Sequence, residues 1–245
     1  MIADLTAKAR KLAAILRVPA WRDVLRRHHV AAGVEHARVL RQFDGCQTVV
    51  DVGANLGQFA LAARHVFPQA RIVSFEPLAG PAALYRAVFA GDDRARLVEA
   101  AVGPQAGEAQ IHVSARDDSS SLLPTTARQN TLFPGTAEAG TATIRVARLA
   151  DEVPAADLAA PALLKLDVQG FELQALAGCE DVLERFAWVY VECSFMELYA
   201  GQSFADEVIA RLRERGLRLV GVYHMAYDGE GRAVQADFLF GRWHP

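Results

Sequence analysis

A short apolar run that passes directly into a glycine-rich turn restricts the fold of this chain more than any other segment. The run ends at Asp51, the chain turns through Gly53, Asn55 and Gly57, and a helical pattern begins immediately afterwards. Glycines allow a tight turn, and they also allow a ligand to approach the backbone at the carboxyl end of a strand. The segment therefore predicts a strand–turn–helix unit that binds a nucleotide, although the tight turn alone would also require these glycines.

The rest of the chain repeats this alternation of apolar runs and helical patterns, which is typical of a parallel α/β sheet. We expect seven strands, at residues 48–51, 71–75, 96–101, 163–167, 188–192, 217–223 and 235–240. We expect helices after the first, second, fourth and fifth of them, at residues 58–66, 81–90, 171–183 and 204–215. With no internal repeat and no interdomain linker, residues 48–245 are expected to form one α/β domain. Within it, residues 103–160 have a Ser-, Thr-, Gly- and Pro-rich centre, and we expect an insertion over the carboxyl edge of the sheet.

The N-terminal segment, residues 1–47, differs from the rest in charge. Residues 1–30 hold seven basic and two acidic residues, a net charge of +5, whereas the remaining residues hold 19 basic and 27 acidic ones, a net charge of −8. Apolar residues near helical spacing, interrupted at Val18 and Pro19, predict two short amphipathic helices. Two interpretations stay open: a helical cap packed on the main domain, or a basic face that contacts an anionic membrane or a lipid-linked substrate.

Composition excludes several classes of protein. With 52% hydrophobic and 22% charged residues over 245 positions, the chain resembles ordinary globular proteins that bury a core. Its uncharged runs fall short of the roughly 18 residues of a membrane span. The uncharged run after the N-terminal basic residues, 12–16, is too short for the secretory h-region of about 7 to 15 residues, so we expect a cytoplasmic protein. The three cysteines lie far apart outside any ligand pattern, so we expect buried reduced thiols. No basic stripe with interleaved aromatics supports nucleic-acid binding.

The end of the second predicted strand narrows the choice of ligand. Glu76 lies 19 residues beyond Gly57, where an acidic side chain can accept hydrogen bonds from ribose hydroxyls. A dinucleotide fingerprint beginning at Gly53 would need two further glycines that this turn lacks, and the chain has no Walker pattern. An acidic residue at the start of the turn, Asp51, suits a ligand whose amino acid end carries a positive ammonium next to a sulfonium. We therefore predict S-adenosylmethionine as the cofactor.

Five motifs follow one another along the chain. They are VDVGANLG at 50–57, SFEP at 74–77, EAAVG at 99–103, SSSL at 119–122 and LKLDVQGFE at 164–172. Over about residues 48–241 the chain thereby resembles the FkbM-type methyltransferases, class I S-adenosylmethionine-dependent enzymes that chiefly methylate hydroxyls on sugars and polyketides. The resemblance implies a Rossmann-like, seven-stranded α/β sheet with its last strand antiparallel. The chain departs from the family at Gln169, where glutamate is common.

The resemblance also implies roles for individual residues. The residues after the first strand would hold the methionine moiety, Glu76 the ribose, and the segment after the third strand the adenine. The implied cofactor set is Asp51, Gly53, Asn55, Gly57, Glu76, Pro77, Ala100, Ala101, Val102 and Asp167. The glycine turn and Glu76 are supported by the residues themselves as well, whereas the adenine contacts rest on the resemblance alone.

Methyl transfer to a hydroxyl needs an oriented acceptor, and orientation can lower the activation free energy by roughly 7 to 11 kcal/mol. It also needs a general base, which raises the rate by a factor of about 10² to 10⁴. Candidate catalytic residues lie at carboxyl ends of predicted strands: Asp167, Glu192 and His224, with Lys165 on the same strand face as Asp167. Lys165 and Asp167 could instead form a structural ion pair, and His224 could simply pack at the solvent edge. Asp167, Gln169 and Glu192 could alternatively bind magnesium. There is no ligand-rich run, so we expect no metal.

The sequence therefore predicts an S-adenosylmethionine-dependent O-methyltransferase. Its partner is expected to be a small-molecule or glycan acceptor with a hydroxyl on a sugar or polyketide-type structure. Two alternatives stay open: a catalytically silent cofactor-binding partner, and a nicotinamide-dependent oxidoreductase.

Overall fold

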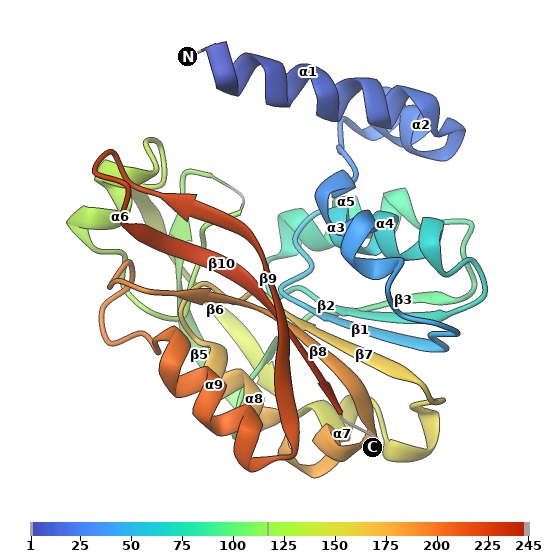
Figure 1. Ribbon diagram of the computed structural model, residues 1–245. Helices are drawn as coiled ribbons and strands as arrows, with labels where there is room; N and C mark the ends of the chain where they lie inside the picture. Colours follow the sequence, from blue (N-terminus) through green and yellow to red (C-terminus); the bar gives the residue numbers. More distant parts are fainter. Residues whose placement is uncertain (1, 117, 243–245) are drawn as a thin grey trace.

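The computed structural model describes residues 2–116 and 118–242, and a seven-stranded sheet lies at its centre (Figure 1). The sheet order is β3-β2-β1-β7-β8-β10-β9. The strands are β1 (Thr48–Val52), β2 (Arg71–Phe75), β3 (Ala95–Val98), β7 (Ala162–Leu166), β8 (Phe186–Ser194), β9 (Leu217–Tyr227) and β10 (Ala233–Arg242). The first five pair in parallel, and β10 runs antiparallel to both β8 and β9. The predicted α/β class and its antiparallel last strand are confirmed.

Helices cover both faces of this sheet. On one face lie α3 (Val34–Leu40), α4 (Gln58–Val66) and α5 (Ala79–Val88), and on the other lie α8 (Glu172–Gly178), the 3₁₀ helix η2 (Glu180–Arg185) and α9 (Ala205–Glu214) (Figure 1). Successive residues of β1 alternate between the two layers: Val49 joins the core under α3–α5, and Val50 joins the core under α8 and α9. All five residues of β1 are buried, as expected for a parallel strand covered on both faces.

One predicted helix, at 171–183, is divided in the structure into α8 and η2. The division falls at Gly178, where the helix passes close to the backbone of Gly103. A Cβ at position 178 would lie 2.4 Å from the carbonyl oxygen of Gly103. Glycine at position 178 therefore permits a close approach between α8 and the segment that follows β4.

The N-terminal segment forms α1 (Ile2–Arg17) and α2 (Pro19–His28), with the break at Val18 where the sequence predicts it. These helices lie on the α3–α5 side of the sheet (Figure 1). Trp21 is buried, and its Nε1 donates a hydrogen bond to the carbonyl oxygen of Leu61 in α4 at 3.2 Å. Leu12 and Leu16 in α1 stay exposed. The segment thus packs on the main body, and contact of its basic face with a membrane stays a prediction.

Residues 103–160 contribute most of a second, three-stranded sheet with the order β4-β6-β5. Its strands are β4 (Ala101–Val102), β5 (Gly107–Ser114) and β6 (Glu138–Ala147), accompanied by α6 (Ala127–Leu132), α7 (Leu149–Glu152) and the 3₁₀ turn η1 (Ala155–Asp157). The prediction of one strand over 96–101 is wrong, because β3 ends at Val98 and the chain then turns to pair with β6 instead.

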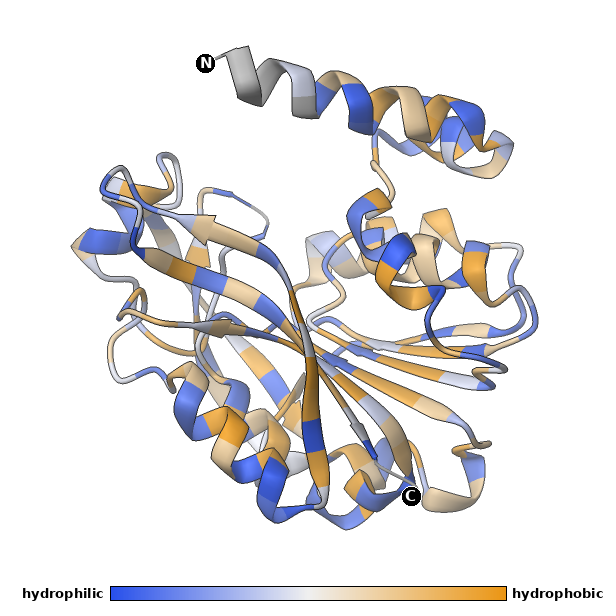
Figure 2. Cartoon of the chain, in the orientation of Figure 1, coloured by the Kyte–Doolittle hydropathy of each residue, from blue (hydrophilic) through white to orange (hydrophobic). Residues whose placement is uncertain are grey.

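Hydropathy follows this layering, since apolar residues are concentrated on the strands of the sheet and polar residues on the outer sides of the helices (Figure 2). All three cysteines are buried free thiols, as the sequence predicts. Within the described residues, no helix combines the length and the apolar character that a membrane crossing requires.

Candidate active site

The turn after β1 is held in a conformation that only glycine adopts easily. Gly53 has φ = 78°, and a Cβ there would lie 1.8 Å from the carbonyl oxygen of Asp167. Gly57 has φ = 92°, and a Cβ there would lie 2.8 Å from the ring of Phe89. Asn55 also adopts a positive φ, 49°. These residues bring the backbone of β1 against the end of β7 and seat α4 on α5.

An ion pair lies beneath this turn. Lys165 Nζ lies 3.1 Å from Asp51 Oδ1 and 3.6 Å from Asp167 Oδ2, and it donates a hydrogen bond to the carbonyl oxygen of Gly53 at 2.9 Å. Burial raises the pKa of Asp51, and Lys165 opposes this effect. Burial lowers the pKa of Lys165, but attraction to the two carboxylates outweighs it and the pKa is raised. Lys165 and Asp51 thus form a buried structural pair.

A first cavity opens between this turn, the ends of β2 and β3, and residues 103–160. It encloses about 690 Å³, including the solvent at its mouth, a size typical of small-molecule sites. The predicted cofactor residues that line it are Gly53, Asn55, Glu76, Pro77, Ala100, Ala101, Val102 and Asp167. Asp51 and Gly57 do not line it, because Asp51 lies under the turn with no exposed surface and Gly57 packs against α5. In this structure these two residues support the turn, and their direct contact with the methionine moiety stays a prediction.

Glu76 is fixed at the end of β2 by backbone hydrogen bonds. Its Oε2 accepts from the N–H of Asn55 and its Oε1 from the N–H of Leu78, both at 2.9 Å. Burial raises the pKa of Glu76 to about 7, and these hydrogen bonds oppose the rise. Each carboxylate oxygen keeps a further lone pair, so the side chain can accept hydrogen bonds from two neighbouring hydroxyls.

The walls of the first cavity match a ligand with one polar and one apolar end. At the turn, Asn55 Oδ1 is buried without a hydrogen-bond partner among the described residues. Around Ala100–Val102 the wall is apolar and includes Ile111, Leu122 and Phe171. A buried acceptor without a partner is costly unless a ligand satisfies it. The cavity thus fits an adenosine cofactor with an ammonium-bearing tail. Sequence reasoning missed Ile111, which lies outside the quoted motifs, and Phe171, which lies within the last of them. Neither is a residue type that signals binding.

A second, polar cavity adjoins the first. It is lined by Arg116, Asp118, Ser119, Gln129, Phe133, Asp167, Gln169, Glu192 and Gln235. Three residues, Asp118, Asp167 and Gln169, line both cavities. Asp118 was not predicted from the sequence, although it directly precedes the motif at 119–122. A ligand in the first cavity and one in the second would therefore meet at these three side chains.

The side-chain amide of Gln169 joins the two predicted catalytic carboxylates. Its Nε2 donates to Asp167 Oδ1 at 2.8 Å and to Glu192 Oε2 at 2.9 Å. Its Oε1 accepts from the hydroxyl of Tyr199 at 2.7 Å. Gln235 donates to the other oxygen of Glu192 at 2.9 Å. Burial, reinforced by the neighbouring carboxylates, raises the pKa of Glu192 well above its usual value.

The other two predicted catalytic residues lie outside both cavities. Lys165 is held in the ion pair described above. His224 lies on β9, where its Nδ1 is 2.6 Å from Asp237 Oδ2. This hydrogen bond raises the pKa of His224, although partial burial opposes it. The structure thus brings Asp167 and Glu192 together and leaves His224 in a separate group.

The sequence of this chain matches a known protein family. The family model for the methyltransferase FkbM domain matches residues 51–219. The chain belongs to the FkbM methyltransferase family. The methyl donor of this family is S-adenosylmethionine, so the predicted family and the predicted cofactor are both confirmed.

Two relatives of this FkbM-family chain carry names that specify methylation of an oxygen atom. The 2-O-methyltransferase NoeI of Sinorhizobium fredii (strain NBRC 101917 / NGR234) is 30% identical over 160 residues, which cover 63% of this chain and 66% of that protein, just under two thirds. The 31-O-demethyl-FK506 methyltransferase FkbM of Streptomyces tacrolimicus is 30% identical over 219 residues, which cover 80% of this chain and 81% of that protein. Among solved structures, TehB from Haemophilus influenzae superposes with a TM-score of 0.49 at 7% identity, over 90% of this chain and 66% of that one. A likeness this distant adds nothing to the fold already described.

Proposed function

We propose that this protein is an S-adenosylmethionine-dependent O-methyltransferase whose acceptor is a hydroxyl-rich small molecule or glycan. The observation that carries the proposal is the junction of the two cavities at Asp118, Asp167 and Gln169. With the cofactor in the first cavity and the acceptor in the second, the donor methyl and the acceptor hydroxyl would meet there. Positioning of this kind supplies much of the rate in a displacement with a good leaving group.

When bound in the first cavity, S-adenosylmethionine would supply an electrophilic methyl group and a neutral thioether as the leaving group. The remaining work of this chain would be to orient the acceptor oxygen and to accept its proton. We assign the hydroxyl proton to Asp167, because its carboxylate lines both cavities. Glu192 lies deeper, with both oxygens receiving amide hydrogen bonds. We therefore assign Glu192 the orientation of the acceptor hydroxyl.

The lining of the second cavity supports a polar acceptor. Arg116, Gln129 and Gln235 offer hydrogen-bond donors, the two catalytic carboxylates offer acceptors, and Phe133 offers an aromatic surface. Sugars and other polyols present hydroxyls in several directions along with apolar C–H faces, so such a mixed lining suits them. The names of the two relatives, a 2-O- and a 31-O-methyltransferase, support oxygen as the atom that is methylated.

A two-part experiment tests this function. Calorimetry with adenosylhomocysteine measures cofactor binding, and mass spectrometry then follows methylated product and adenosylhomocysteine in reactions with a panel of sugars, glycans and macrolides. We expect binding and, with a matching hydroxyl acceptor, one added methyl per product. A protein that does not bind adenosylhomocysteine would overturn the cofactor assignment. Binding without turnover across the panel would favour a catalytically silent partner.

A further inference from the structure

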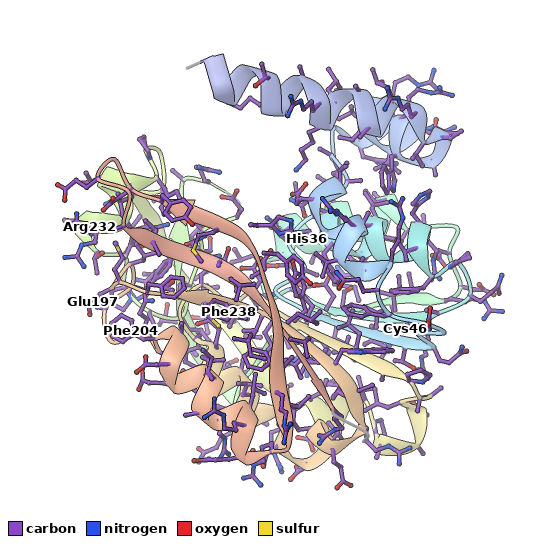
Figure 3. The ribbon with its side chains drawn as sticks, viewed as in Figure 1. His36, Cys46, Glu197, Phe204, Arg232 and Phe238 are labelled. Atoms are coloured by element: carbon purple, nitrogen blue, oxygen red, sulfur yellow. The ribbon has the colours of Figure 1, made fainter. Side chains whose placement is uncertain are left out.

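Four side chains from four different elements meet on the face of the sheet that α3 covers. They are His36 of α3, Tyr190 of β8, His224 of β9 and Asp237 of β10. Figure 3 labels His36, which lies between α3 and the sheet. None of the four lines the first or the second cavity. The group is thus distinct from the candidate active site, although Asp237 pairs with Glu192 across β10 and β8.

One carboxylate oxygen, Asp237 Oδ2, is at the centre of this group. It lies 2.6 Å from His224 Nδ1, 2.7 Å from the Tyr190 hydroxyl and 3.7 Å from His36 Nδ1. The Tyr190 hydroxyl lies 3.2 Å from His36 Nδ1 and 3.3 Å from His224 Nδ1. Each of these atoms is therefore within hydrogen-bond or ion-pair distance of at least two others.

These separations are close to the edges of a coordination tetrahedron. The nitrogens and oxygens that bind zinc lie about 2.0 Å from the ion, which places neighbouring ligand atoms about 3.3 Å apart. Five of the six separations among the four atoms are 2.6 to 3.7 Å and lie on both sides of that value. The ligand atoms offered by His36, His224 and Asp237 all lie within 4.8 Å of one another. An ion at the centre would require only small side-chain movements.

The backbone at His224 departs from a regular strand where its side chain joins this group. His224 has φ = 50°, in the left-handed region that non-glycine residues seldom adopt. The pairing of β9 with β10 shifts register between Gln235 and Asp237, beside the same point. Such strained positions persist where the surrounding structure requires them, and they occur often at ligand sites.

Burial of the group also suits a bound ion. The Tyr190 side chain is buried, and the side chain of Asp237 is 12% exposed. The His36 and His224 side chains are 20% and 34% exposed, so the imidazoles leave a path to solvent. Two imidazoles and a carboxylate are ligands that zinc, cobalt(II) and nickel(II) accept, whereas magnesium prefers oxygen ligands alone.

We propose that His36, His224 and Asp237 bind a divalent first-row transition metal ion of the zinc class, with the hydroxyl of Tyr190 as the fourth donor. The ion would join α3, in the N-terminal segment, to the β9–β10 hairpin beside the second cavity. The sequence predicts no metal, because no continuous stretch of the chain is rich in metal-ligating residues. A search for such a stretch cannot detect the proposed ligands, because they come from separate elements and meet only in the folded chain.

The test uses the full-length protein without an affinity tag, stripped of metal with a chelator and then dialysed. Calorimetry with zinc chloride should give one site per chain, and zinc should raise the melting temperature, since an ion that binds only the folded state stabilises it. Cobalt(II) should produce the visible bands of a tetrahedral nitrogen and oxygen site without a thiolate charge-transfer band. His36→Ala and Asp237→Asn should each weaken zinc binding tenfold or more.

A matched control exists on the second sheet. His112 Nδ1 lies 2.9 Å from Glu138 Oε2, and among the described residues this pair belongs to no three-residue group of possible metal ligands. His112→Ala should leave zinc affinity unchanged. Tyr190→Phe should weaken it because the hydroxyl is the proposed fourth ligand, and unchanged affinity would remove Tyr190 from the ligand set. Circular dichroism checks the fold of each variant.

Three outcomes would overturn the proposal. The first is a parent protein that binds neither zinc nor cobalt(II) stoichiometrically. The second is binding that persists in folded His36→Ala and Asp237→Asn proteins. The third is a thiolate band, which would assign the ion to a cysteine. Because metal binding is the readout, none of these outcomes bears on methyl transfer.

Discussion

Lys165 Nζ lies 3.1 Å from Asp51 Oδ1 beneath the turn that follows β1, and both side chains are buried. The same ammonium donates to the carbonyl oxygen of Gly53, so the pair holds the turn against the end of β7. Both residues belong to the sequence motifs, yet neither lines a cavity. Their contribution to the candidate active site is the shape of the turn.

The first prediction concerns the stability of this pair. Lys165→Met should lower the free energy of unfolding by about 3 to 5 kcal/mol, because Asp51 would be left buried without a counter-charge. The double variant Lys165→Met, Asp51→Asn should recover a large part of this loss. Urea unfolding of the parent, both single variants and the double variant gives the coupling energy. If the double variant loses as much free energy of unfolding as the two single variants together, the two charges do not stabilise each other.

The second prediction concerns Glu76 and cofactor binding. Glu76→Ala should weaken adenosylhomocysteine binding by roughly 1.5 to 3 kcal/mol, the range for hydrogen bonds to a charged group. Because the pKa of Glu76 is raised to about 7, the affinity of the parent should fall as the pH drops through 7, when the carboxylate becomes protonated. Glu76→Gln should remove this pH dependence. Calorimetry between pH 6 and 8 measures both effects, and unchanged affinity in a folded Glu76→Ala protein would reject the ribose assignment.

The third prediction concerns the two carboxylates of the second cavity. Asp167→Asn and Glu192→Gln should each keep the fold, and Glu192→Gln, which lies outside the first cavity, should also keep the affinity for adenosylhomocysteine. At least one of the two variants should lower turnover by roughly 10² or more. Assays without added magnesium should show the same parent activity as assays with it. If both amide variants turn over within about threefold of the parent, neither side chain carries the proton, and desolvation of the acceptor becomes the better account.

The fourth prediction concerns the bridging amide. Gln169→Glu would replace a donor that lies 2.8 Å from Asp167 and 2.9 Å from Glu192 with a third carboxyl group. Like charges this close oppose further ionisation. The pH at which turnover reaches half of its plateau should therefore move upward by about one unit or more. Gln110→Glu, on the exposed edge of β5, is the control and should leave the profile unchanged. An unchanged profile in Gln169→Glu as well would contradict the role of the bridge.

The fifth prediction concerns Glu172, the first residue of α8. Burial raises its pKa to about 7, although its Oε1 accepts from the N–H of Gly170 at 2.9 Å. Between its usual value of 4.5 and about 7 the folded state binds more protons than the unfolded state, so this group lowers stability as the pH rises through that window. Glu172→Gln should therefore stabilise the protein more at pH 8 than at pH 5, by up to about 3 kcal/mol. Urea unfolding at both values measures this, with exposed Glu184→Gln as the control, and an equal effect at both pH values would contradict it.

Local patterns in the sequence were sufficient for the class of fold, the cofactor and the family. Strands show as apolar runs, and the residues that follow them gather at one edge of a parallel sheet. For this reason the pattern of residues places Glu76 beside Gly53. The family resemblance adds Pro77 and Ala100–Val102, and all of these residues line the first cavity. The split after Val98 was missed because pairing of Ala101 with β6 depends on a segment more than 40 residues away.

Burial and long-range pairing, by contrast, were decided only by the tertiary structure. Asp51 is covered because Lys165 reaches it from the neighbouring strand, and Gln169 joins Asp167 to Glu192 because β7 and β8 end side by side. His36 meets Asp237 only once the N-terminal segment has packed on the sheet. Chain neighbours set the local conformation of a residue, whereas its charge partners and its access to ligand depend on strand register and helix packing. The sequence alone therefore determined the family of this protein and the methyl donor of that family. The tertiary structure decided which of its polar side chains line the two cavities and which support the fold.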